Sequence, residues 1–138
     1  MPTEVPGKAA DVQPDALVIR FRPTDPESVL NWAAKAHRDC GRYLLSVFAD
    51  KARHGESDAD LRKRLLDAAG ISGLDLANQK KYYVCTQAKE LLDRGFAFTK
   101  DEDDDEMVEH YSVDLGTEPT LEDVTRFLDA FPVEERLS

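Results

Sequence analysis

The chain has 138 residues, of which 41% are hydrophobic and 33% are charged. This length allows one domain with its own hydrophobic core and is short for two, and the composition is that of a folded globular protein. No apolar run approaches the roughly 20 residues that a membrane-spanning helix needs, and the N-terminus lacks the basic start and apolar stretch of a secretory signal. Only two cysteines occur, Cys40 and Cys85, so we expect no disulfide framework and a cytoplasmic location.

The net charge of −10 is distributed unevenly along the chain. Residues 41–95 contain ten Lys or Arg against eight Asp or Glu, whereas residues 96–138 contain three against fourteen. The first forty residues carry five against six. The acidity therefore belongs to the C-terminal part, and the centre is mildly basic. The overall charge argues against a general nucleic-acid binder but leaves a local basic surface possible.

The N-terminal part predicts an arm followed by a strand. Residues 1–15 are rich in proline and poor in apolar side chains, so we expect a flexible arm. Residues 16–22 (Ala-Leu-Val-Ile-Arg-Phe-Arg) are apolar and β-branched, which predicts a strand that ends at Pro23. Arg20 and Arg22 alternate with apolar residues there, so we expect both arginines on the solvent-exposed face of a sheet edge.

A helix is predicted next, because Asp25 can cap it and Pro26 suits the first helical position. Gly41 marks a break or a kink in this helix. Residues 42–53 continue the same apolar spacing and are also predicted to be helical. A strand over residues 43–49 is the main alternative.

Two further helices and a turn follow in the centre of the chain. Ser57 caps a helix that ends at Gly70, and residues 71–73 form the turn. A longer helix is predicted over residues 74–94, and Gly95 suits the left-handed residue that ends it.

The C-terminal part predicts a β-hairpin and a last helix. Residues 96–99 and 109–115 alternate between apolar and polar, and the acids of residues 101–106 form the hairpin tip. Thr120 caps a helix that Pro132 stops. Its apolar stripe consists of Leu121, Val124, Phe127, Leu128 and Phe131. A single small core is expected to combine Leu61, Leu65, Val84, Leu91 and Val113.

Four stretches carry a resemblance to a known superfamily. They are Tyr43-Leu44-Leu45-Ser46-Val47-Phe48, His54-Gly55-Glu56-Ser57, Ala69-Gly70-Ile71-Ser72 and Leu91-Leu92-Asp93-Arg94-Gly95-Phe96. In this order, residues 42–115 resemble the winged helix-turn-helix domains of bacterial transcription regulators. The resemblance implies an α+β protein with a mostly helical winged-helix core, to which an N-terminal strand and a C-terminal helix are added. Residues 16–138 would form one domain.

The same resemblance implies a DNA-binding surface. The third helix would enter the major groove and present Asn78, Gln79, Lys80 and Lys81 to base edges or phosphates. Basic residues of the second helix would neutralise phosphates, namely Arg62, Lys63 and Arg64, with Lys51 and Arg53 beside them. The simpler alternative is that all of these residues are the solvated faces of amphipathic helices.

The acidic run offers a second kind of site. As a calcium loop it fails twice, because Glu106 stands where glycine is needed and Ser112 where glutamate is needed. A solvated hairpin tip is the simplest interpretation, and a docking site for a basic protein partner comes next. The residues of such a partner site would be Asp101, Asp103, Asp104 and Asp105, with Phe127 and Phe131 of the last helix.

No set of residues predicts catalysis, a cofactor or a metal. His37 and Cys40 share a helix face, but a second pair of ligands is missing and helix packing is the better interpretation. The leading hypothesis is a non-enzymatic DNA-binding transcriptional regulator that binds double-stranded DNA as a homodimer. The alternative is an acidic protein-interaction module, such as an accessory, antitoxin-like or immunity-like protein, that binds a basic protein.

Overall fold

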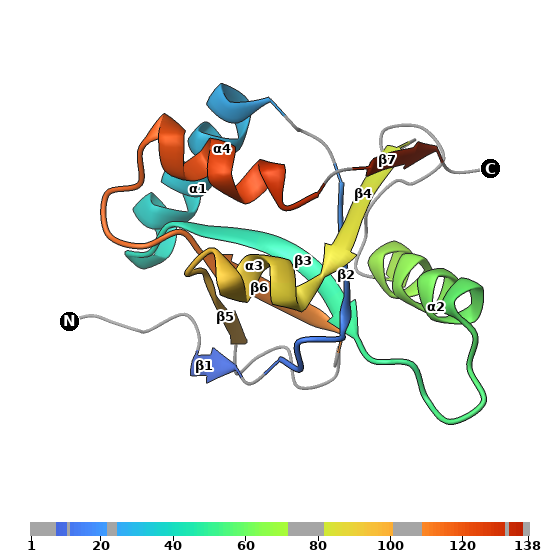
Figure 1. Cartoon of the computed structure of the whole chain (residues 1–138). Coiled ribbons are helices and arrows are strands. Elements are labelled where there is room, and N and C mark those ends of the chain that lie inside the picture. Colours follow the sequence, from blue (N-terminus) through green and yellow to red (C-terminus); the bar gives the residue numbers. More distant parts are fainter. Residues whose placement is uncertain are drawn as a thin grey trace.

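A computed structural model describes residues 8–10, 12–21, 25–71, 82–100, 109–131 and 133–136 of the chain. Within these ranges the chain forms strands and four helices in an α+β arrangement (Figure 1). The strands are β1 (Lys8–Ala10), β2 (Leu17–Phe21), β3 (Leu44–Asp50), β4 (Tyr82–Gln87), β5 (Ala97–Lys100), β6 (His110–Asp114) and β7 (Val133–Arg136). The helices are α1 (Pro26–Cys40), α2 (Asp58–Ile71), α3 (Ala88–Asp93) and α4 (Leu121–Asp129).

The strands form one 7-stranded sheet in the order β1-β5-β6-β3-β2-β4-β7. Every pairing in it is antiparallel. The middle strand, β3, pairs with β2 on one side and with β6 on the other. Segments near the two ends of the chain supply the outermost strands of the described sheet, β1 and β7.

Helices pack on both faces of the sheet (Figure 1), and α2 covers its face only around β2, β3 and β4, since Ser46 and Ala97 on that face are exposed. Residues 18 and 47 point to the face that α1, α3 and α4 cover, whereas residues 19 and 48 point to the face that α2 covers. This division follows from the two-residue period of a strand. The larger cluster includes Val18, Val29, Val47, Leu91, Phe98, Val113 and Phe127. The smaller one consists of Leu17, Ile19, Phe21, Phe48, Tyr83, Leu61, Leu65 and Ala68.

The predicted helix ends are confirmed where capping residues mark them. The Asp25 carboxylate accepts a hydrogen bond from the Ser28 backbone N–H at 3.0 Å. Gly41, predicted as a break or kink in a continuing helix, instead ends α1, with φ of 83°. Thr120 and Asp123 form a reciprocal capping box at the start of α4. The predicted strand near residues 16–22 is confirmed as β2, and the predicted hairpin as β5 and β6.

The prediction that residues 42–53 are helical is wrong, and the strand alternative is correct. Residues 44–50 form β3, in the middle of the sheet. Val47 points to one helical layer and Phe48 to the other. Because residues on both faces of β3 are apolar, the strand lacks the alternation of apolar and polar residues that marks a half-buried strand. A strand buried on both faces then has a pattern that a buried helix can share.

The predicted third helix over residues 74–94 is also wrong. Of the described residues in this range, 82–87, Tyr-Tyr-Val-Cys-Thr-Gln, form β4, and 88–93 are helical. Aromatic and β-branched side chains favour the pleated surface, and β4 lies between β2 and β7. The mostly helical winged-helix core is therefore contradicted, because a long antiparallel sheet organises the protein instead.

Two smaller expectations also fail. The single core is wrong because Leu61 and Leu65 lie on the α2 face, while Val84, Leu91 and Val113 lie on the opposite face. Arg20 is not at an exposed sheet edge: β2 lies inside the sheet, and the residue is only 5% exposed. Residues 8–10, within the predicted arm, form β1.

Candidate functional site

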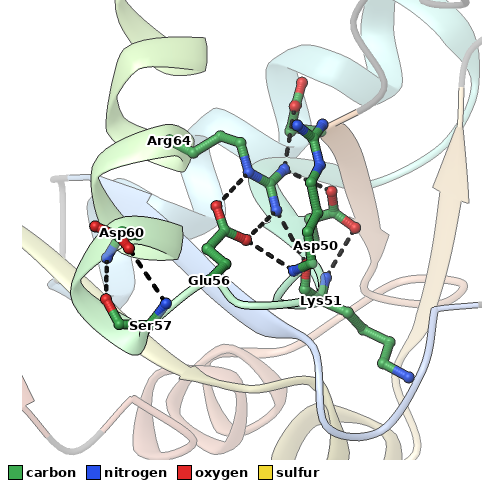
Figure 2. A network of polar contacts seen from close by, with 8 residues as sticks. Asp50, Lys51, Glu56, Ser57, Asp60 and Arg64 are labelled. Carbon is green, nitrogen blue, oxygen red and sulfur yellow. Dashed lines mark hydrogen bonds and ion pairs between the residues drawn. The ribbon is translucent and has the colours of Figure 1, made fainter.

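The most extensive polar cluster is centred on Arg64 of α2 (Figure 2). Its Nε and Nη2 donate to the two carboxylate oxygens of Glu56, each at 2.9 Å. Its Nη1 donates to Asp50 Oδ2 at 2.7 Å and to Glu109 Oε2 at 3.4 Å. Its Nη2 also donates to the Lys51 carbonyl oxygen at 3.0 Å. One guanidinium thus joins α2, the end of β3, the loop after it and the start of β6.

The hydrogen bonds of the cluster shift the pKa values of Glu56 and Arg64 in opposite directions. Hydrogen bonds from the Arg64 side chain, and then from the Arg53 backbone N–H, lower the pKa of Glu56 to about 2. The hydrogen bond with Glu56 also raises the pKa of Arg64, so the pair stays charged. Because the Arg64 side chain is only 16% exposed, its five donors are directed into the protein. Arg64 is therefore a structural crosslink.

Close to this cluster, Ser57 and Asp60 exchange two hydrogen bonds that fix the start of α2. The Asp60 backbone N–H donates to the Ser57 hydroxyl at 3.1 Å, and the Ser57 N–H donates to the Asp60 carboxylate at 3.3 Å (Figure 2). The predicted cap at Ser57 is confirmed. The cap fixes the helix start, and the helix then carries Arg64 to the carboxylates.

The residues predicted for phosphate contact on α2 mostly face acids of the same chain. Lys63 forms an ion pair with Asp67 at 3.2 Å, one turn further along the helix. Arg62 is half-buried and also interacts within the chain. With Arg64 in its cluster, the three basic residues do not form one open cationic surface. Asn78, Gln79, Lys80 and Lys81, predicted to face base edges, lie outside the described residues.

Two residues predicted to bind a partner lie in the protein's own core. Phe127 is fully buried and Phe131 is 7% exposed. The Phe127 ring lies 5.3 Å from the Phe131 ring and 5.7 Å from the Phe96 ring, centroid to centroid. The Arg20 guanidinium lies 5.6 Å from the Phe127 centroid. Burial lowers the pKa of Arg20 to about 10. These phenylalanines are not presented to a partner here.

The acids predicted to bind a partner, Asp101, Asp103, Asp104 and Asp105, lie outside the described residues, but the residues that flank them are fixed. On one side, Lys100 Nζ donates to the His110 carbonyl oxygen at 2.6 Å and lies 4.7 Å from the Tyr111 ring centroid. On the other side, the Glu109 carboxylate accepts from Arg64. Since β5 and β6 are neighbouring antiparallel strands, the acidic run connects them at one end of the sheet.

One polar pair was not predicted from the sequence. The Ser46 hydroxyl and the His110 Nε2 are hydrogen-bonded at 2.5 Å, and the His110 ring lies 5.3 Å from the Phe48 ring. Glu109, the residue before His110, pairs with Arg64. The hydrogen bond between Ser46 and His110 ties β3 to β6. No local motif could reveal it, because 64 residues separate its members and only the strand register brings them together.

The described parts of the chain contain no candidate metal cluster and no candidate membrane span. No group of three or more His, Cys, Asp or Glu residues there is arranged to hold a metal ion. His37, three residues before Cys40, stacks on Tyr43 at 4.2 Å between ring centroids. None of the helices in these ranges is both long and apolar enough to span a bilayer.

Comparisons of the chain with protein-family models, with curated proteins and with solved structures find no match.

Proposed function

We propose that this protein is a non-enzymatic, cytoplasmic binding module for a basic protein partner, and that the acidic run of residues 101–106 is its principal contact. The observation that carries the proposal is the fixation of Glu109 by Arg64. This contact, with that of Lys100 on the other side, holds both flanks of the run against the sheet. The described residues on either side of residues 101–108 are thus held in place by contacts with the sheet and with α2.

The charge next to the run supports the same partner. Three carboxylates surround the single guanidinium of Arg64, so this group of four side chains carries a net charge of −2. Concentrated negative charge beside a rigid support attracts a cationic partner and increases its association rate. Binding of this kind requires no reactive group, which agrees with the non-enzymatic hypothesis.

Duplex DNA is the less favoured ligand. Residues 82–87 of the helix expected to enter the major groove form β4 instead, and two basic residues of α2 pair with acids of their own chain. A protein that neutralises phosphates needs several lysines or arginines free to replace counterions. The described part of α2 supplies few of them.

The experiment compares two variants of equal net charge. The first neutralises the run by changing Asp101, Asp103, Asp104 and Asp105 to Asn. The second changes four exposed acids elsewhere to their amides: Asp39, Asp58, Asp93 and Glu118. Fluorescence anisotropy is measured with a labelled lysine- and arginine-rich peptide and, separately, with a labelled DNA duplex, at low salt and at about 0.15 M salt.

We expect the peptide to bind the wild type and the second variant similarly, and the first variant at least tenfold more weakly. Equal weakening in both variants would show that only net charge matters, and this result would overturn the proposal. Saturable binding of the duplex, without binding of the peptide, would overturn it in favour of the DNA-binding hypothesis.

A further inference from the structure

Two exposed apolar side chains lie on the neighbouring helices α1 and α4. Among the described residues, the exposed large hydrophobics are Trp32 on α1, Leu121 on α4 and Leu92 on α3. Trp32 is 53% exposed and Leu121 is 45% exposed. Helices α1 and α4 pack against one another on the same face of the sheet (Figure 1). Exposed tryptophan is rare on a free surface and is enriched at the energetic centres of interfaces.

The charges around these two side chains are complementary. Lys35 places its Nζ 5.3 Å from the Trp32 ring centroid, and Arg38 is exposed one turn further along α1. On α4, Glu122 and Asp129 are exposed, and the exposed Arg126 between them in the sequence forms an ion pair with Asp123 at 3.0 Å. Helix α1 therefore offers an indole beside cations, and α4 offers a leucine beside carboxylates. The acids of α1, Glu27 and Asp39, are in its first and last turns.

From this arrangement we infer that the outer surface of α1 and α4 is the interface of a symmetric homodimer. A twofold axis passing between the two helices would place α1 of each copy on α4 of the other. Trp32 would then meet Leu121 of the second copy, and Lys35 and Arg38 would meet its acids. Such a self-complementary contact closes after two copies and leaves no open end.

The dimensions of the helices limit the strength of this dimer. At 1.5 Å per residue, α1 is about 22 Å long and α4 about 13 Å long. Two such helices per copy cover less than a standard interface of roughly 800 Å² per partner, so we expect micromolar affinity. The interface does not involve the acidic run, and the inference therefore does not depend on the proposed partner.

Sedimentation velocity of the full chain across a range of concentrations tests the inference. Trp32→Ala and Leu121→Ala are each expected to weaken dimerisation at least tenfold, whereas Leu92→Ala is the matched control and leaves it unchanged. The double variant Lys35→Glu with Arg38→Glu is expected to be monomeric. Adding Glu122→Lys and Asp129→Lys to that variant restores attraction and is expected to restore the dimer.

Three results would overturn the inference. The first is a wild type that stays monomeric at several hundred micromolar. The second is a Leu92→Ala variant that disrupts the dimer as strongly as Trp32→Ala does. The third is a fourfold charge reversal that fails to restore association. All of these substitutions are at exposed positions, so unfolding transitions close to that of the wild type will confirm that each variant is folded.

Discussion

Arg64 shows how one residue type can have two opposite uses. Its position in a run of three basic residues predicted contact with phosphates, yet three carboxylates of the same chain surround it. The sequence distances to Glu56, Asp50 and Glu109 are 8, 14 and 45 residues, so no local pattern could reveal them. Only the fold, which brings α2 beside the ends of β3 and β6, determines which acids this arginine meets.

Replacing Arg64 should therefore destabilise the protein. We expect Arg64→Met to lower the free energy of unfolding by about 2 to 3 kcal/mol, because it leaves three carboxylates close together without their donor. Urea denaturation at neutral pH measures the change. Lys63→Met is the matched control: its ion pair with Asp67 is exposed, and its loss should cost less than about 1 kcal/mol. Equal effects of the two substitutions would contradict the role given to Arg64.

The same cluster predicts a pH dependence. The pKa of Glu56 is about 2 in the folded protein and ordinarily 4.5, so folding favours the ionised carboxylate. Its contribution to stability is fully present above about pH 4.5 and is lost as the pH falls toward 2. We expect Glu56→Gln to be less stable than the wild type near neutral pH, with a difference that shrinks in acid.

Thermal unfolding over a series of pH values from neutral to about 2.5 measures that difference. The control is the same substitution in an Arg64→Met background, where the main cause of the lowered pKa is absent. There the difference should vary much less with pH. A difference between wild type and Glu56→Gln that stays constant over the whole range would exclude this linkage.

At the scale of helices and strands, the sequence is most informative where a residue interacts only with near neighbours in the chain. The carboxylate of Asp25 and the hydroxyl of Thr120 each act within a few residues, and each marked a helix start correctly. The strand β3 was predicted only as the alternative to a helix, and β4 was missed, because their identity depends on distant neighbours. Both lie inside the sheet, and tertiary burial overrides the local pattern there.

The capping box of α4 gives a prediction at this scale. The Thr120 hydroxyl accepts a hydrogen bond from the Asp123 backbone N–H at 3.2 Å. We expect Thr120→Ala to reduce the free energy of unfolding by about 1 kcal/mol. Thr125→Ala is the control within the same helix, because the Thr125 hydroxyl bonds only the preceding turn at Leu121 and alanine favours helix. A similar loss for both variants would mean that the cap is not formed.

For the molecule as a whole, the sequence predicted an α+β class and the uneven charge, but not the architecture. One core was expected, whereas the sheet separates two. The reason is visible in β2, where Val18 and Ile19 are both fully buried and point to opposite helical layers. An all-apolar strand of this kind needs cover on both faces. The candidate site was predicted only as an acidic run, since its anchors depend on strand pairing.

The position of the sheet between two helical layers decides which surfaces remain for binding. Because α2 covers one face, Arg64 meets Glu109 and fixes one flank of the acidic run. Helices α1 and α4 cover the other face of the sheet. Phe127 points into the core beneath them and is buried, whereas Trp32 is exposed. Both proposals therefore depend on the 7-stranded sheet.

Nuclear Overhauser contacts between backbone protons in solution test the sheet most directly. In the 7-stranded arrangement, Ile19 has Phe48 as its cross-strand neighbour on one side and Cys85 on the other. We predict contacts from Ile19 to both residues. Sequential amide-to-amide contacts typical of a helix through residues 44–50 and 82–87, without contacts to Ile19, would contradict the fold and everything built on it.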